Sequence, residues 1–196
     1  KVAELHAASA KYYELNGSYG PLFDLSFYTE NNRPMFEMMA ATRKGSFQRA
    51  MREWPLENPE YYVEKLSCSN KFFDEALRLN NHRAKFNVLN HGDCWSNNLM
   101  FNYKENGDIN ETLFVDFQVG KWGSPAHDLW YILTTSINLD IKVKEFDRFI
   151  SIYHERLVEC LKLLKYEQYV PSLKELHVMM LEYGFFSKWY IFKFRA

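Results

Sequence analysis

Apolar side chains recur at helical spacing near both ends of the chain. At the start they fall three or four residues apart, at Val2, Leu5, Ala8 and Tyr12. In the last third they keep this spacing over about five turns, at Phe146, Ile150, Tyr153, Leu157, Cys160 and Leu164. One face of a helix has this period, so the pattern predicts helices over residues 1–15 and 146–164 with these side chains buried.

A proline and its capping residue predict where the next helix begins. Asn58 is suited to the N-cap and Pro59 to the first helical position, where its missing N–H costs nothing. This helix is predicted to run to about Leu79 and to bury Tyr62, Leu66, Phe73 and Leu77. Residues 22–57 are interrupted by two prolines and are predicted to form only short helical pieces.

Two more helices in the second half of the chain carry start signals. Ser124-Pro125 repeats the pairing of a cap with a proline. Ser172 and Glu175 fit the S-x-x-E capping box, in which each side chain accepts from a backbone N–H of the other residue. The last helix is predicted to turn three side chains inward, Leu173, Leu176 and Met180.

The middle of the chain changes from helical spacing to two short apolar runs, residues 99–103 and 112–117. Asn106-Gly107 lies between the runs, which is typical of a β-hairpin. Strands paired about the glycine bring Asn98 opposite Asp116, within a residue or two of register. The sequence therefore predicts one domain of the α+β class, mostly α, with one small β-hairpin.

Composition narrows the function classes. The 196 residues hold 24 Lys+Arg against 25 Asp+Glu, a net charge of -1, which argues against a non-specific nucleic-acid binder. The three cysteines stand far apart without a C-x-x-C pair, so no zinc knuckle or disulfide framework is encoded, and a reducing, cytoplasmic compartment is predicted. No stretch approaches the roughly 20 apolar residues of a membrane span.

The polar stretch before the hairpin carries the candidate chemistry. Residues 91–98 read His-Gly-Asp-Cys-Trp-Ser-Asn-Asn and fit H-x-D-x-x-x-x-N, the spacing of a kinase catalytic loop. Gly92 stands where protein kinases have arginine. After the second apolar run comes Asp116, and in kinases an aspartate that follows a strand here holds magnesium.

The hairpin predicts that these pieces form one site. An amide oxygen from Asn98 and a carboxylate from Asp116 suit a hard cation such as Mg²⁺. Asp93, one loop away, can accept the proton of an attacking hydroxyl. Phosphoryl transfer requires mainly positioning and charge neutralisation, and these three groups supply both.

Other interpretations of these polar residues are weaker. Asp and Asn near turns often serve only as local caps. A hydrolase built from Ser124, His127 and Asp128 fails because the three are nearly adjacent at one helix start and no G-x-S-x-G elbow exists. His91 and Cys94 lack the second pair that a four-ligand metal site needs.

Residues 87–101 resemble the catalytic loop of the insect ecdysteroid kinase-like family. This family, also called CHK kinase-like, is related to choline kinases and aminoglycoside phosphotransferases. Four further stretches resemble it as well: Leu5 to Ser9, Val115 to Gln118, Gly123 to Leu129 and Pro171 to Gly184. The resemblance implies a CHK kinase-like domain over residues 1–186, the larger C-terminal lobe of a protein-kinase-like fold, followed by an atypical tail over 187–196.

The resemblance also implies a role for each motif residue. Asp93 would be the catalytic base, His91 a structural member of its loop, and Asp128 a residue that braces the loop. Asn98 and Asp116 would bind Mg²⁺ and through it ATP. The implied substrate is a small-molecule alcohol, often steroid-like. His6 is predicted to be a buried, hydrogen-bonded histidine rather than a ligand. Nothing in the sequence indicates an oligomeric state.

The sequence does not show the motifs by which a kinase binds the nucleotide phosphates. The eight glycines are scattered, and no G-x-G-x-x-G loop or strand lysine for the nucleotide phosphates is found. The expected nucleotide lobe is therefore absent from these residues. The alternative function is a truncated, non-catalytic fragment that acts as a binding or regulatory module.

Overall fold

The computed structural model describes residues 1–24, 29–55, 57–66, 69–81 and 84–187. Helices dominate these residues, and the strands form two small antiparallel pairs, β1 with β4 and β2 with β3, as the predicted α+β class requires. The helices are α1 (Val2–Asn16), α2 (Pro21–Asp24), α3 (Arg33–Glu53), α4 (Pro59–Leu66), α5 (Ser69–Asn81), α6 (Ala126–Thr135), α7 (Leu139–Leu163) and α8 (Leu173–Glu182). The strands are β1 (Val88–Asn90), β2 (Leu99–Tyr103), β3 (Ile109–Phe114) and β4 (Lys121–Gly123), and short 3-10 turns occur at Glu30–Asn32 and Ser96–Asn98.

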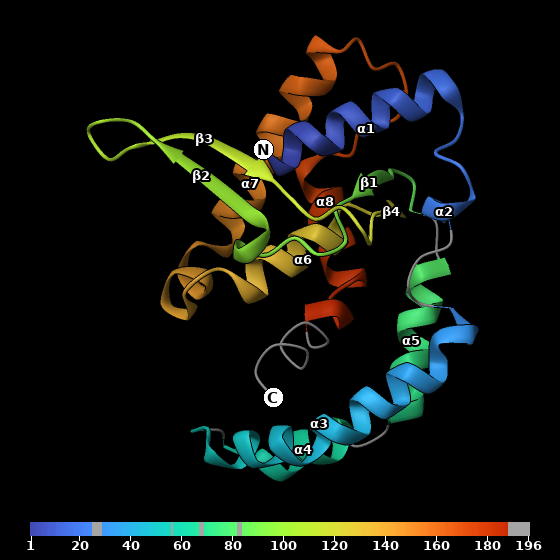
Figure 1. Cartoon of the computed structure of the whole chain (residues 1–196), viewed down its shortest axis with the longest axis vertical. Helices are drawn as coiled ribbons and strands as arrows, with labels where there is room; N and C mark the ends of the chain where they lie inside the picture. Colours follow the sequence, from blue (N-terminus) through green and yellow to red (C-terminus); the bar gives the residue numbers. More distant parts are fainter. Residues whose placement is uncertain (25–28, 56, 67–68, 82–83, 188–196) are drawn as a thin grey trace.

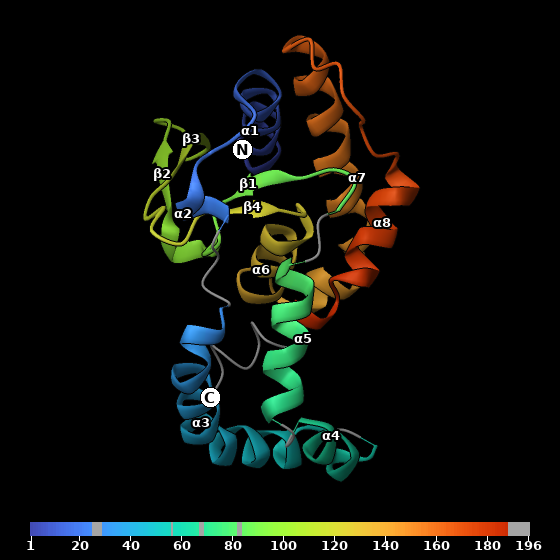
Figure 2. The ribbon, with the colours of Figure 1, turned by 90° about the vertical axis from the view of Figure 1, so that its right-hand side faces the viewer.

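The main body consists of α1, α6, α7 and α8 packed with the short β1–β4 pair. Helices α3 and α4, with the far end of α5, extend away from this body (Figures 1 and 2). The buried apolar side chains of α1, α6, α7 and α8 join those of β1 in one core, which also takes in parts of α3 and α5. No helix among the described residues is both long enough and apolar enough to cross a bilayer.

Helix α1 is present as predicted, but its buried face is different. Its buried residues are Ala3, His6, Ala7, Ser9 and Ala10, whereas Ala8 and Tyr12 are exposed and Val2 and Leu5 are only partly covered. Small side chains on this face let α1 pack closely on α7 and on β1. The polar members are tolerated because they have partners, as when Ser9 Oγ accepts from the Leu89 N–H at 2.9 Å.

The region predicted to hold only short helical pieces contains the 21-residue helix α3, so that prediction was wrong. Pro34 lies in the first turn of α3, where a proline starts a helix rather than breaking it. The Asn58 cap is confirmed, because its Oδ1 accepts from the Tyr61 N–H at 3.2 Å. The single helix predicted after it is two helices, and residues 67–68 between them lie outside the described residues.

Of the side chains predicted to be buried in that stretch, only Phe73 is fully covered. Tyr62 is exposed, Leu77 is half-buried, and the Leu66 side chain lies outside the described set. The last two helices agree better with the pattern. Most of the predicted face of α7 is buried, and so are the inner residues of α8, Leu176 and Met180.

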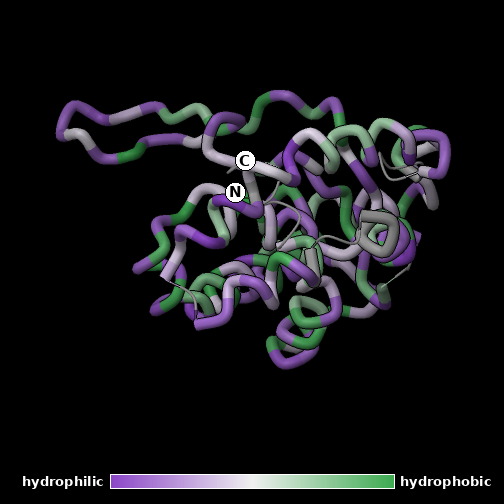
Figure 3. Tube along the Cα trace, turned by 90° about the horizontal axis from the view of Figure 1, so that it is seen from below, coloured by the Kyte–Doolittle hydropathy of each residue, from purple (hydrophilic) through white to green (hydrophobic). Residues whose placement is uncertain are grey.

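The hairpin is present at the predicted place with its register one residue away from symmetry about Gly107. Leu99 pairs with Phe114, and the ladder is shifted by a bulge between Asn102 and Tyr103. The hairpin projects from the body and has a hydrophilic tip (Figure 3). The three-residue pair of β1 with β4 was not predicted, because strands this short show no periodicity.

The capping box of α8 makes stability depend on pH. Hydrogen bonds from the Ser172 side chain and backbone lower the pKa of Glu175 from 4.5 to about 2. A lowered pKa means that the ionised cap stabilises the fold above pH 4.5 and that this contribution is lost as the pH falls toward 2. Ser172→Ala is expected to lower the Tm by a few degrees at pH 7 and by much less near pH 2, where Glu175 takes up its proton in the folded protein. Thermal unfolding followed by circular dichroism measures both, and Ser151→Ala on α7, a serine outside any cap, is the control. An equal effect at both pH values would contradict the prediction.

Candidate functional site

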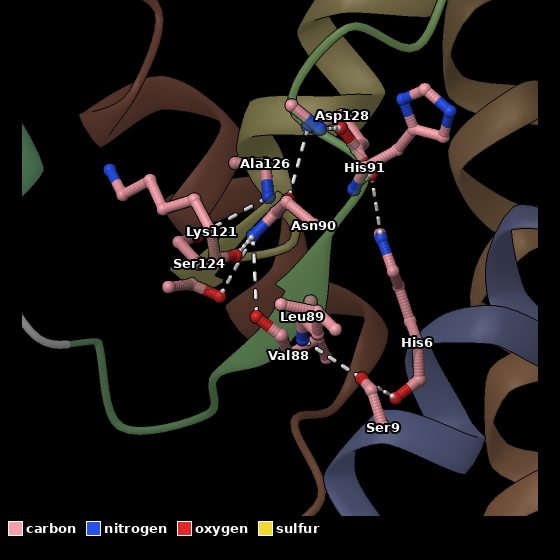
Figure 4. A network of polar contacts seen from close by, with 12 residues as sticks. His6, Ser9, Val88, Leu89, Asn90, His91, Lys121, Ser124, Ala126 and Asp128 are labelled. Atoms are coloured by element: carbon pink, nitrogen blue, oxygen red, sulfur yellow. Dashed lines mark hydrogen bonds and ion pairs between the residues drawn. The ribbon is translucent and has the colours of Figure 1, made fainter. Parts of the chain in front are cut away.

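The loop that carries the motif begins where β1 ends, and the side chain of Asn90 fixes that point. Its Nδ2 donates to the carbonyls of Lys121 at 3.3 Å and Gly123 at 3.2 Å, both on β4. Its Oδ1 accepts from the N–H of Asp128 at 3.3 Å. Asn90 therefore holds both short strands against the start of α6 (Figure 4).

Asp128, in the first turn of α6, is the buried acceptor beneath the loop. Its Oδ2 accepts from the His91 N–H at 2.6 Å and from His6 Nε2 at 3.1 Å, and its Oδ1 accepts from the Gly92 N–H at 2.9 Å. A carboxylate that is 1 % exposed requires this many donors. The geometry fits the expected bracing role of Asp128.

His6 reaches this carboxylate from α1 (Figure 4). Its other ring nitrogen, Nδ1, accepts from the Tyr153 hydroxyl of α7 at 2.8 Å. Burial, with a smaller contribution from the nearby Asp128 charge, raises the pKa of Tyr153 well above its usual value of 10, so the phenol remains a donor. The prediction of a buried, hydrogen-bonded His6 is confirmed.

His91 joins the loop to the end of the hairpin. Its Nε2 donates to the Val115 carbonyl at 2.9 Å, and its Nδ1 accepts from the Asp93 N–H at 3.3 Å. The ring also lies 4.6 Å from the Phe117 ring, measured between centroids. His91 thus connects Val115, the residue before Asp116, to Asp93.

Gly92 explains why this loop lacks the arginine of protein kinases. Its φ is +82°, a conformation that side-chain-bearing residues rarely adopt. A Cβ added there would lie 2.1 Å from the Val119 carbonyl oxygen. The loop can approach the segment after Asp116 this closely only because residue 92 has no side chain.

The Asp93 carboxylate is held from two sides. Oδ2 accepts from Asn98 Nδ2 at 2.9 Å, and the same amide donates to the Asp93 carbonyl at 2.9 Å. Oδ1 accepts from the hydroxyl of Tyr131 on α6. The sequence analysis missed Tyr131, although it follows Asp128 by three residues and so lies on the same face of the helix, a spacing that would have indicated it.

The hairpin brings Asn98 close to Asp116. The Asn98 carbonyl accepts from the Val115 N–H at 3.1 Å, which extends the ladder by one pair and leaves Asp116 as the next residue. Asp116 is exposed, with a φ of +66°, and its Oδ2 accepts from Gln118 Nε2 at 3.2 Å. The structure thus supports the predicted proximity, with the pair one residue out of register.

The side-chain oxygens of Asn98 and Asp116 are suitable ligands for a magnesium ion. The Asn98 amide nitrogen is directed at Asp93, so the Oδ1 at its other side is the atom that would contact a cation, together with the Asp116 carboxylate. Mg²⁺ in proteins is commonly held by one or two side-chain oxygens, with phosphate oxygens and water as the remaining ligands. Among the described residues, no three His, Cys, Asp or Glu side chains gather in a metal-binding group.

The geometry does not support the hydrolase arrangement. Ser124 Oγ accepts from the Ala126 N–H at 3.3 Å, as a cap does. His127 Nε2 lies 3.0 Å from Lys121 Nζ, and its ring lies 4.3 Å from that of Phe186 between centroids. Burial, and to a lesser degree the Lys121 charge, lowers the pKa of His127 well below 6.5, so the neutral ring packs in the core.

The metal pair of His91 and Cys94 is equally unsupported. Cys94 is 1 % exposed, and burial raises the pKa of its thiol well above the usual 9. A buried thiol that keeps its proton is a poor metal ligand. His91 already uses both ring nitrogens within the protein.

Comparison with known proteins agrees with the geometry of the loop. The model of the ecdysteroid kinase-like family matches residues 1–166, which include the motif, the hairpin and Asp128. No curated protein and no solved structure matches the chain. A match over this much of its length shows that the chain belongs to the ecdysteroid kinase-like family.

Proposed function

We propose that the chain is an ATP-dependent phosphotransferase that acts on a hydroxyl of a small molecule, with a steroid-like alcohol as the acceptor class. Membership of the family indicates kinase-like phosphotransferase activity. The observation that carries the proposal is the Asp93 carboxylate, held between Asn98 and Tyr131 beside the Asn98–Asp116 pair. We also propose that residues 1–186 form the larger lobe of a protein-kinase-like fold.

Each polar group has a distinct task in this proposal. Asp93 orients the acceptor hydroxyl and takes up its proton. Asn98 and Asp116 hold Mg²⁺, which when bound neutralises charge on the phosphates. Asp128 and His91 keep the loop in the shape that brings these groups together.

Dependence on magnesium at Asp116 tests the proposal. The chain is incubated with γ-labelled ATP, Mg²⁺ and a panel of small alcohols that includes steroid alcohols, and the label on the acceptor is counted. We expect transfer that a chelator abolishes, and we expect Asp116→Asn to require a Mg²⁺ concentration higher by about tenfold or more because the site loses its charged ligand. Asp108→Asn at the hairpin tip is the matched control.

Two results would contradict the proposal. One is transfer that persists without a divalent cation, and the other is an Asp116→Asn variant indistinguishable from Asp108→Asn.

A binding module without turnover is the second candidate. It is favoured by exposed apolar side chains along the hairpin, at Met100, Phe101, Ile109 and Leu113. Retention of labelled ATP without any transfer to an acceptor would favour this candidate over the enzyme.

A further inference from the structure

Helix α6 contacts the catalytic loop at successive points in the order of the loop itself. Asp128 accepts from the backbone of His91 and Gly92, as described above. Tyr131, three residues later, donates to Asp93. Beyond the end of the helix, Ser136 Oγ accepts from the Ser96 N–H at 2.8 Å. Helix α6 and the residue that follows it therefore hold the loop by hydrogen bonds at residues 91–92, 93 and 96.

Tyr131 is the member of this series that contacts the side chain of the proposed base. It is 1 % exposed, so water does not compete for its hydroxyl. An ionised carboxylate can only accept hydrogen bonds, so the phenol is the donor to Oδ1. Asn98 is the donor to Oδ2. With a different donor on each oxygen, rotation of the carboxylate would break both hydrogen bonds.

Helix α6 is itself well anchored behind Tyr131. Trp130, next to Tyr131 in the chain, donates from Nε1 to the Met180 carbonyl of α8 at 2.8 Å and so joins α6 to α8. A functional side chain is held most accurately when its support lies on a rigid element. Tyr131 meets this condition.

We propose that Tyr131 is a positioning residue for phosphoryl transfer, a role that rests on the proposed function. Its phenol fixes Oδ1 of Asp93 and thereby keeps Oδ2 on the amide nitrogen of Asn98. That amide can then turn only its oxygen toward the metal. A single hydroxyl on α6 thus sets both the direction of the base and the orientation of a metal ligand.

Tyr131→Phe tests this role, because it removes the hydroxyl and keeps the ring. We expect kcat for phosphoryl transfer to fall about 10- to 100-fold, while KM for the acceptor changes by less than about threefold, as for an interaction needed in the transition state. Tyr19→Phe, which removes a hydroxyl bonded to the Ser9 carbonyl at 2.7 Å, is the matched control and should retain the activity of the unmodified chain.

A spectroscopic readout accompanies the kinetics. The chain is labelled with ¹³C at the tyrosine Cζ atoms, and the Tyr131 signal is identified as the one missing from Tyr131→Phe. Loss of the carboxylate in Asp93→Ala should move this signal and leave the Tyr19 signal in place. A general loss of folding would instead move many signals together.

The outcomes separate the positioning role from the proposed function. Suppose that the unmodified chain transfers phosphate and that Asp93→Ala abolishes the transfer. If Tyr131→Phe is then as active as Tyr19→Phe, the positioning role of Tyr131 is wrong and the proposed function stands. A chain without any transfer overturns the function and, with it, the catalytic purpose of the hydrogen bond. A Tyr131 signal that ignores Asp93→Ala overturns the hydrogen bond itself.

Discussion

Asp93→Asn is expected to lower kcat for phosphoryl transfer by about 10²- to 10⁴-fold, the range of a lost general base. Asparagine has the same shape, but it presents an amide nitrogen in place of one carboxylate oxygen. That nitrogen would face a donor, because Oδ1 receives the Tyr131 hydroxyl and Oδ2 the Asn98 amide. The variant therefore loses the proton acceptor and misorients the side chain.

The measurement is steady-state transfer of label to an alcohol acceptor by equally folded proteins. Asp108→Asn, the same change at the exposed hairpin tip, should leave kcat within about twofold of the unmodified chain. Transfer by Asp93→Asn at the rate of this control would remove Asp93 from the reaction.

Asp128→Ala is expected to lower the free energy of unfolding by about 3–5 kcal/mol, the cost of removing one partner from a buried polar cluster. The loss leaves the N–H groups of His91 and Gly92 and the ring of His6 without their acceptor in a dry site. Because these bonds tie residues 91–92 to α6, we expect the proposed phosphoryl transfer to fall as well.

Urea unfolding measures this change, and Asp140→Ala supplies a close control. Asp140 also lies in the first turn of a helix, but it is exposed. Any interaction with the helix dipole is therefore common to both variants, and burial is the difference between them. If Asp128→Ala unfolds at the same urea concentration as Asp140→Ala, the buried hydrogen bonds to Asp128 do not stabilise the fold.

The motif and the hairpin could be predicted because both depend on local sequence. Residues 91–98 place a carboxylate and an amide at a fixed spacing, and Asn106-Gly107 determines where the strands reverse. Two local facts were then enough to predict that Asn98 and Asp116 lie near each other. The final register required the bulge between the Asn102 and Tyr103 pairs, which the alternation of residues does not reveal.

The supports of the site could not be predicted, because they join segments far apart in the sequence. His6 reaches Asp128 across 122 positions, and Tyr131 reaches Asp93 across 38. The burial of His6 could be predicted, but its partners Asp128 and Tyr153 could not. A search for apolar periodicity passes over Ser9, since polar residues are buried only where a distant partner satisfies them. The buried face of α1 was misassigned for the same reason.

Because of the hairpin, the distance between Asn98 and Asp116 does not depend on how many residues connect them. Asn98 and Asp116 lie at the base, where strand pairing fixes the distance between them, while residues 104–108 form a turn at the far end. Residues added at that turn would lengthen the loop without moving the base, since loop entropy grows slowly with length. The tip is therefore a suitable point for insertions, and a reporter domain placed there should leave the Asn98–Asp116 pair undisturbed.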